Sequence, residues 1–116
     1  MSSYIEKLLD IATGVALGRL EYHQNYNLGA ASHRRDGALV VTCNGTQKAP
    51  VWQHHAEARL CRKLTPTALV AVVRVLANGS WAMARPCEGC QTCMRRTGVE
   101  RVVYSIAPGE YGIMNL

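Results

Sequence analysis

Three cysteines crowd into one short stretch of the sequence, PCEGCQTC at residues 86–93. Cys87 and Cys90 stand three positions apart at the start of a predicted helix, a spacing that lets both sulfurs face one point. The exposed N–H groups and the dipole of a helix start favour the thiolate, which is the form that binds metal. A Cys-x-x-Cys pair alone also fits a redox dithiol, so a metal site needs further ligands elsewhere in the chain.

The third ligand is sought among the remaining cysteines and histidines. Cys93 lies one more turn along the predicted helix, about 4.5 Å further down its axis, away from the helix start. We interpret Cys93, like Cys43 and Cys61, as a buried packing thiol. His55, which opens another predicted helix, is the better candidate. With the cysteine pair it gives three protein ligands and leaves a fourth position open for water, which is the arrangement of catalytic rather than structural zinc.

A carboxylate follows this histidine at the offset that such chemistry needs. Glu57 can take a proton from the water and return it to a substrate nitrogen and to the leaving group. His54 lacks the same offset to the glutamate. The structural alternative is that His55 and Glu57 belong to an ordinary capped helix start.

The elements that must position these residues alternate between helices and strands. Apolar periodicity predicts a helix over 4–20, which Ser3 can cap. A turn at Asp36-Gly37 predicts a hairpin within 27–45. Further along, the patterns predict a helix over 55–64, a central strand over 68–76 with a turn at 78–79, a helix from 86 to 97, and a strand over 99–106. Residues 109–116 are too short to assign. We therefore predict an α/β fold, a three-layer α-β-α sandwich with a mixed sheet of about five strands.

The composition indicates the class of protein, its possible partners and its cellular location. The 116 residues, 48% of them hydrophobic and 18% charged, predict one globular domain over 1–116. The formal charge of +5 suits an anionic partner such as a nucleotide phosphate or a nucleic acid. The N-terminus has no signal-peptide order and no stretch is long enough to span a bilayer, so we expect a cytoplasmic protein without a membrane partner. A domain this small favours a homo-oligomer.

Taken together, these motifs resemble a known sequence signature. His-x-Glu followed by Pro-Cys-x-x-Cys, each opening a predicted helix, matches the signature of zinc-dependent nucleobase deaminases. From about Asn27 to Tyr104 the sequence resembles the cytidine deaminase-like superfamily. The strand end TCNG before the histidine loop and the strand GVERVVYS after the cysteine helix are further matches.

The resemblance implies a role for each residue of the metal site. His55, Cys87 and Cys90 would hold Zn²⁺, and Glu57 would move protons. Hydroxide would attack the ring carbon that bears the exocyclic amine, and ammonia would leave. Mutating Glu57 to alanine should keep the zinc and abolish turnover.

The resemblance also implies substrate contacts. Asn44 would contact the sugar or the base, and the Ala56 N–H would bond to the base carbonyl. Arg85 stands before Pro86, where many relatives have Glu, Ser or Thr against the base. Its charge suits a substrate phosphate, and a solvent-facing strand residue is the alternative.

Three functions follow from these observations. The leading hypothesis is hydrolytic deamination of a free cytosine nucleoside or nucleotide. The alternative is deamination of cytosine or adenine in single-stranded DNA or RNA, which positive charge favours and the scarcity of aromatic residues opposes. The third is a non-catalytic, zinc-stabilised binding module, which would not need Glu57.

Overall fold

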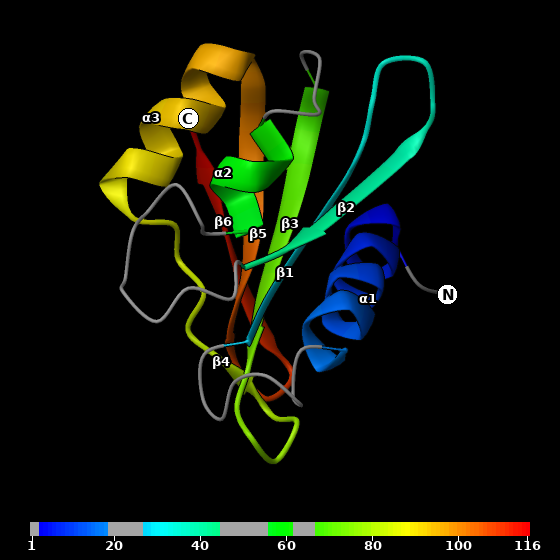
Figure 1. Ribbon diagram of the computed structural model, residues 1–116, viewed down its shortest axis with the longest axis vertical. Coiled ribbons are helices and arrows are strands. Elements are labelled where there is room, and N and C mark those ends of the chain that lie inside the picture. The colour runs from blue at the N-terminus through cyan, green and yellow to red at the C-terminus, as the bar shows by residue number, and fades with distance from the viewer. Residues whose placement is uncertain (1–2, 19–26, 45–55, 62–66) are drawn as a thin grey trace.

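The computed structural model describes residues 3–18, 27–44, 56–61 and 67–116 (Figure 1). In chain order the elements are α1 (Tyr4–Leu17), β1 (Asn27–His33), β2 (Leu39–Cys43), α2 (Ala56–Cys61), β3 (Thr67–Val75), β4 (Trp81–Ala82), α3 (Glu88–Thr97), β5 (Val99–Ala107) and β6 (Glu110–Asn115). Across these ranges we find no helix with the length and apolar character needed to cross a membrane.

A mixed sheet forms the middle of the molecule. Its strand order is β2-β1-β3-β5-β6, and the short β4 pairs with β3 beside this path. Among the described strands, β3 and β5 pair in parallel and the other pairings are antiparallel. The parallel pair needs a crossover, which α3 supplies between β4 and β5. The predicted mixed sheet is therefore confirmed.

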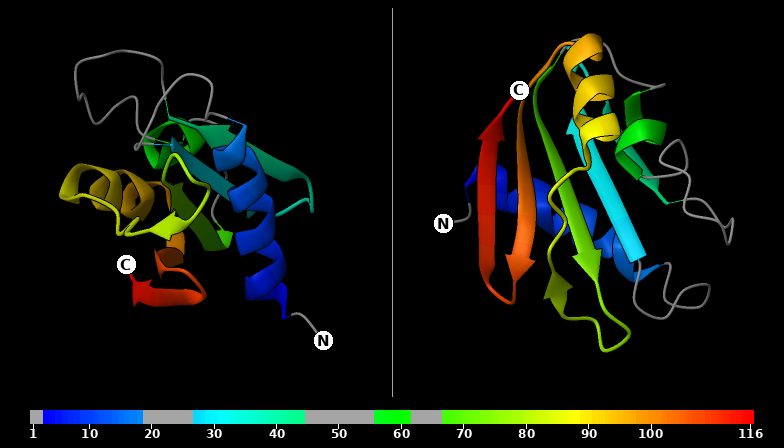
Figure 2. Two further views of the ribbon diagram at one scale, coloured as in Figure 1. Left: turned by 90° about the horizontal axis from the view of Figure 1, so that it is seen from below. Right: turned by 90° about the vertical axis from the view of Figure 1, so that its left-hand side faces the viewer.

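Helices cover both faces of the sheet, as the predicted three-layer sandwich requires (Figure 2). On one face, α1 packs Leu8, Leu9, Ala12 and Ala16 against strand residues such as Ala71. On the other face, α2 and α3 share a second apolar cluster with β1, β3 and β5. The apolar stripe of α1 was readable from its helical spacing, and its predicted cap forms, since the Glu6 N–H donates to Ser3 Oγ at 3.1 Å.

The last strand, β6, is one that the sequence analysis left unassigned. It turns back from β5 through a tight turn at Gly109, whose φ of +75° suits glycine, and pairs antiparallel with β5. Its exposed side chains at Tyr111 and Ile113 alternate with the more buried Gly112 and Met114. The Pro-Gly pair before this alternation is the turn signal that could have predicted the hairpin.

Close packing between α1 and β1 depends on Gly29. A Cβ at this position would lie 2.2 Å from Ala12 O and 2.7 Å from Ala16 N, both backbone atoms that cannot move aside. We expect Gly29→Ala to lower the free energy of unfolding by about 3 kcal/mol or more, measured by urea denaturation.

The matched control is Gly14→Ala, in the interior of α1, where an added Cβ meets nothing within 4 Å. That substitution should raise the free energy of unfolding by about 0.5–1 kcal/mol, because alanine forms helix better than glycine. Equal effects of the two substitutions would contradict the close approach of α1 to β1.

Candidate active site

Cys87 and Cys90 lie at the start of α3, as their spacing predicts. Cys87 is the N-cap residue, in extended conformation and exposed, and Cys90 is buried in the first turn. Gln91 holds this turn from inside the helix, because its Nε2 donates to Pro86 O at 2.8 Å and its backbone N–H donates to Cys87 O at 2.9 Å. The helix ends at Gly98, whose φ of +96° gives the predicted left-handed cap.

The start of α2 is held against the end of β2. Ala56, its first residue, is fully buried, and its carbonyl accepts a 2.5 Å hydrogen bond from Thr42 Oγ1. Arg59 reaches back from the same helix and donates to Cys43 O at 3.2 Å. Sequence reasoning missed Thr42; its signal is a polar residue in an otherwise apolar strand, which must find a partner when it is buried.

The first turns of α2 and α3 each contribute a residue to one buried apolar cluster. Ala56 and Cys90, each in the first turn of its helix, belong to the same buried apolar cluster beneath α2 and α3. Figure 1 shows the two helices side by side over the same face of the sheet, and the two helices contact each other. The fold therefore places α2 and α3 in contact, although their first residues lie about thirty positions apart in the sequence.

The predicted third metal ligand, His55, lies outside the described residues. The backbone of Glu57 lies in the first turn of α2, and its side chain is also outside what the structure describes. In the part of the chain that is described, no three His, Cys, Asp or Glu side chains gather as a metal site. The predicted ligand set of His55, Cys87 and Cys90 therefore stays a prediction.

Asn44 directly follows β2 and is buried. Its backbone N–H donates to Leu28 O at 3.3 Å, and its Oδ1 accepts from Leu28 N–H at 3.0 Å. The first bond extends the β1–β2 pairing by one residue, and the second orients the side-chain amide. Arg85 is exposed on the segment that leads into Cys87, between the buried residues Ala84 and Pro86.

The other three cysteines are less buried than the predicted packing thiols. No disulfide joins any of the five cysteines, and Cys43, Cys61 and Cys93 are only partly buried. The buried positions of α3 are Cys90 and Met94, four residues apart, so Cys93 falls on the flank of that stripe. There it lines a pocket of about 410 Å³ formed by α3 residues.

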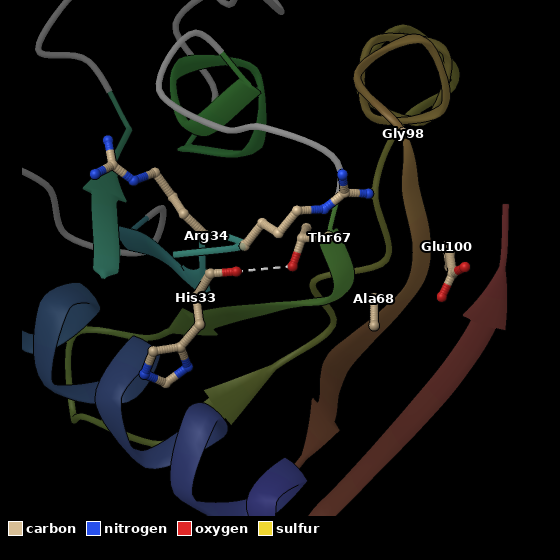
Figure 3. A pocket seen from close by; sticks show the side chains of 7 residues that line it. His33, Arg34, Thr67, Ala68, Gly98 and Glu100 are labelled. Carbon is tan, nitrogen blue, oxygen red and sulfur yellow. Dashed lines mark hydrogen bonds between the residues drawn. The ribbon is translucent and has the colours of Figure 1, made fainter. Parts of the chain in front are cut away.

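A polar pocket of about 310 Å³ lies at another part of the sheet (Figure 3). Its lining residues are His33, Arg34, Arg35, Thr67, Ala68, Gly98 and Glu100. The His33 carbonyl accepts a hydrogen bond from Thr67 Oγ1 at 2.8 Å, while the imidazole turns away toward α1. Gly98 closes the C-terminal end of α3, whereas Cys87 caps its other end. None of the predicted site residues that the structure describes lines this pocket.

One pKa shift has a clear cause next to that pocket. The Ala38 N–H and the Arg34 guanidinium both bond to the Asp36 carboxylate and hold its pKa below the ordinary value. The Arg34–Asp36 ion pair spans 2.9 Å, and both side chains are solvent-accessible. The pair therefore orders the β1–β2 turn rather than the candidate active site.

Known proteins match this chain in structure but not in sequence. No family model matches the sequence, and no curated protein matches it significantly. A cytidine deaminase from Burkholderia pseudomallei superposes with a TM-score of 0.68 at 20% identity, covering 99% of this chain and 93% of that one. Cytidine deaminases from Mycobacterium leprae (TM-score 0.64, 18% identity, 97% and 94% coverage) and Mycobacterium tuberculosis (0.59, 21%, 92% and 90%) match similarly.

The chain thus has the fold of the cytidine deaminases. This confirms the fold that the sequence resemblance predicted, including helices on both faces of a mixed sheet. The identities of 18–21% establish the fold alone.

Proposed function

We propose that this chain is a zinc-dependent hydrolytic deaminase of a cytosine nucleoside or nucleotide, acting as one domain over residues 1–116. The observation that carries the proposal is that α2 and α3 contact each other over one face of the sheet and that one buried cluster includes a residue from each of their first turns. The start of α3 contributes Cys87 and Cys90, and the start of α2 contributes Ala56 and Glu57. The likeness in fold to cytidine deaminases supports the same reading.

The donor set fits zinc. Two thiols separated by one helical turn are soft ligands with the spacing that zinc sites use, and His55 would add an imidazole from the residue just before α2. The protein would supply three ligands, so a water could take the fourth position. Bound there, zinc would lower the pKa of that water enough to make it a nucleophile near neutral pH.

The chain's own residues would do the remaining work. Glu57, in the first turn of α2, would accept one proton of the attacking water and pass it to the ring nitrogen. It would then take the second proton, from the newly added hydroxyl, and pass it to the amine, which leaves as ammonia. The backbone N–H of Ala56 would donate to the base carbonyl. Asn44 would contact the sugar or the base through an amide group whose orientation the Leu28 N–H already fixes.

The exposed Arg85 favours a phosphorylated substrate. It lies two residues before Cys87, on the segment that enters the candidate site, and its guanidinium is exposed rather than packed into the core. Arginine pairs well with phosphate oxygens because its donors form a planar fork. A nucleotide would therefore use both the metal site and this arginine.

The cytoplasmic setting and the homo-oligomer stay predictions.

The test is a mass-spectrometric deamination screen with zinc-loaded protein and a Glu57→Ala control. The panel contains cytidine, deoxycytidine, their mono- and triphosphates, adenosine and guanine species, and single-stranded DNA and RNA. Conversion of a cytosine nucleoside or nucleotide, absent in the control, is the expected result. Conversion of a polymer alone would replace the proposal with nucleic-acid deamination. No conversion by a zinc-bound protein would favour a non-catalytic zinc module.

A further inference from the structure

Ser105 on β5 forms hydrogen bonds to β3 and to the segment that precedes the predicted metal ligands Cys87 and Cys90. The parallel pairing of β3 with β5 is recorded as far as Val72 and Tyr104, and Ser105 follows next on β5. Beyond that point β4 lies between the two strands (Figure 2), and we call residues 81–84 the β4 segment. It pairs with β3 on one side, and on the other the Ala84 N–H donates to Ser105 O at 2.9 Å.

The Ser105 hydroxyl completes this junction. It accepts a hydrogen bond from the Arg74 N–H of β3 at 3.1 Å and donates to the Ala82 carbonyl of β4 at 2.7 Å. The residue is fully buried, so water does not replace these bonds when the hydroxyl is removed. Together with its own carbonyl, Ser105 holds the β4 segment at two points, Ala82 and Ala84.

The held segment leads directly to the candidate metal ligands. Only Arg85 and Pro86 separate Ala84 from Cys87, and the Pro86 carbonyl is itself bonded by Gln91. The start of α3 is thus tied on one side to the sheet through Ser105 and on the other to its own first turn. A shift of Ala82 or Ala84 would therefore be passed to Cys87 over a short, proline-stiffened link.

We propose that Ser105 is a positioning residue for the Cys87–Cys90 pair, setting where the start of α3 stands relative to the sheet. The inference rests on the metal site of the proposed function. It assigns Ser105 no contact with substrate or metal. Supporting groups around a metal site commonly change metal affinity by about 10–100-fold when they are removed.

Ser32 provides a matched control on β1, which β3 separates from β5 in the sheet. It is also a fully buried strand serine, and its hydroxyl donates to Leu69 O at the same 2.7 Å. It lies near the end of β1, beside Thr67 at the start of β3, and has no part in the β4 junction. Ser105→Ala removes the two hydroxyl bonds to Arg74 and Ala82, whereas Ser32→Ala removes the bond to Leu69 O and longer contacts to Thr67 Oγ1 and the His33 carbonyl. Both substitutions therefore delete a buried hydroxyl, and only Ser105→Ala loosens the segment before Cys87.

The experiment compares Ser105→Ala with Ser32→Ala and the unmodified chain at a temperature where circular dichroism shows all three folded. Zinc affinity is measured by competition with a chromophoric chelator, and cobalt(II) substitution reports the thiolate-to-metal absorption band. We expect Ser105→Ala to bind zinc about tenfold more weakly than Ser32→Ala, with an altered cobalt spectrum. Should either alanine variant fail to fold, Ser105→Thr and Ser32→Thr give the same comparison, because they add a methyl group that displaces the buried hydroxyl and introduce no further thiol.

The outcomes separate this inference from the proposed function. Equal zinc affinities and equal cobalt spectra in the two variants overturn the role of Ser105 and leave the deaminase proposal standing. An unmodified chain that binds no zinc overturns both. A chain that binds zinc without deaminating any member of the panel overturns the proposed activity, while the zinc affinities still decide the role of Ser105.

Discussion

Cys90→Ser is expected to abolish tight zinc binding and, with it, deamination. The side chain is fully buried in the first turn of α3, within the cluster that also contains Ala56 at the start of α2. A serine hydroxyl is a much poorer zinc ligand than a thiolate, and the burial of the position leaves no room for a replacement ligand. The loss of zinc affinity should exceed the roughly 10–100-fold that the loss of a supporting group causes.

Cys93→Ser is the matched control for this substitution. Cys93 stands three residues further along α3, is only partly buried and lines a separate pocket with Thr92 and Arg96. The Cys93→Ser variant should bind as much zinc as the unmodified chain, measured by inductively coupled plasma mass spectrometry after dialysis. It should also keep the activity of the unmodified chain. If Cys93→Ser lost zinc while Cys90→Ser retained it, the metal would be held by a different pair of cysteines.

The parts of the fold that could be predicted depend on local patterns. The Asp36-Gly37 turn gave the β1–β2 hairpin, and the residues from Pro86 to Gly98 gave α3 with both of its ends, because turns and caps are encoded within a few residues. The last strand, β6, could not be assigned because residues 109–116, with Gly112 among them, are too short a stretch. A Cβ at Gly112 would meet the end of the Tyr104 ring at 2.8 Å, so a larger residue there would require the ring on the neighbouring strand to shift.

In the candidate site, too, local relations could be predicted from the sequence and long-range ones could not. Cys87 and Cys90 could be placed at a helix start from their spacing, since their relation is local. Thr42 and Ser105 could not be assigned a role, because each bonds to a partner that only the sheet pairing brings near, 14 residues away for Thr42 and 23 and 31 residues away for Ser105. Such buried polar residues can be flagged in a sequence, while their partners depend on the tertiary structure.

The second large effect is expected at Glu57. Replacing it with glutamine keeps the size and shape of the side chain and removes the group that would accept a proton. Removing a general acid or base typically costs about 10²–10⁴-fold in rate. We expect Glu57→Gln to retain zinc at the stoichiometry of the unmodified chain and to lose turnover by about 10³-fold, measured as initial rates on the substrate that the screen identifies.

Glu88→Gln is the matched control, because Glu88 is the acidic residue in the first turn of the other helix, α3, and its side chain is exposed. Both substitutions remove a negative charge that a helix start favours, so a general effect of charge on the helix dipole would appear in both. Only Glu57→Gln should lose turnover. Loss of zinc in Glu57→Gln would make Glu57 a metal ligand, and full activity in that variant would place the proton transfer on another residue.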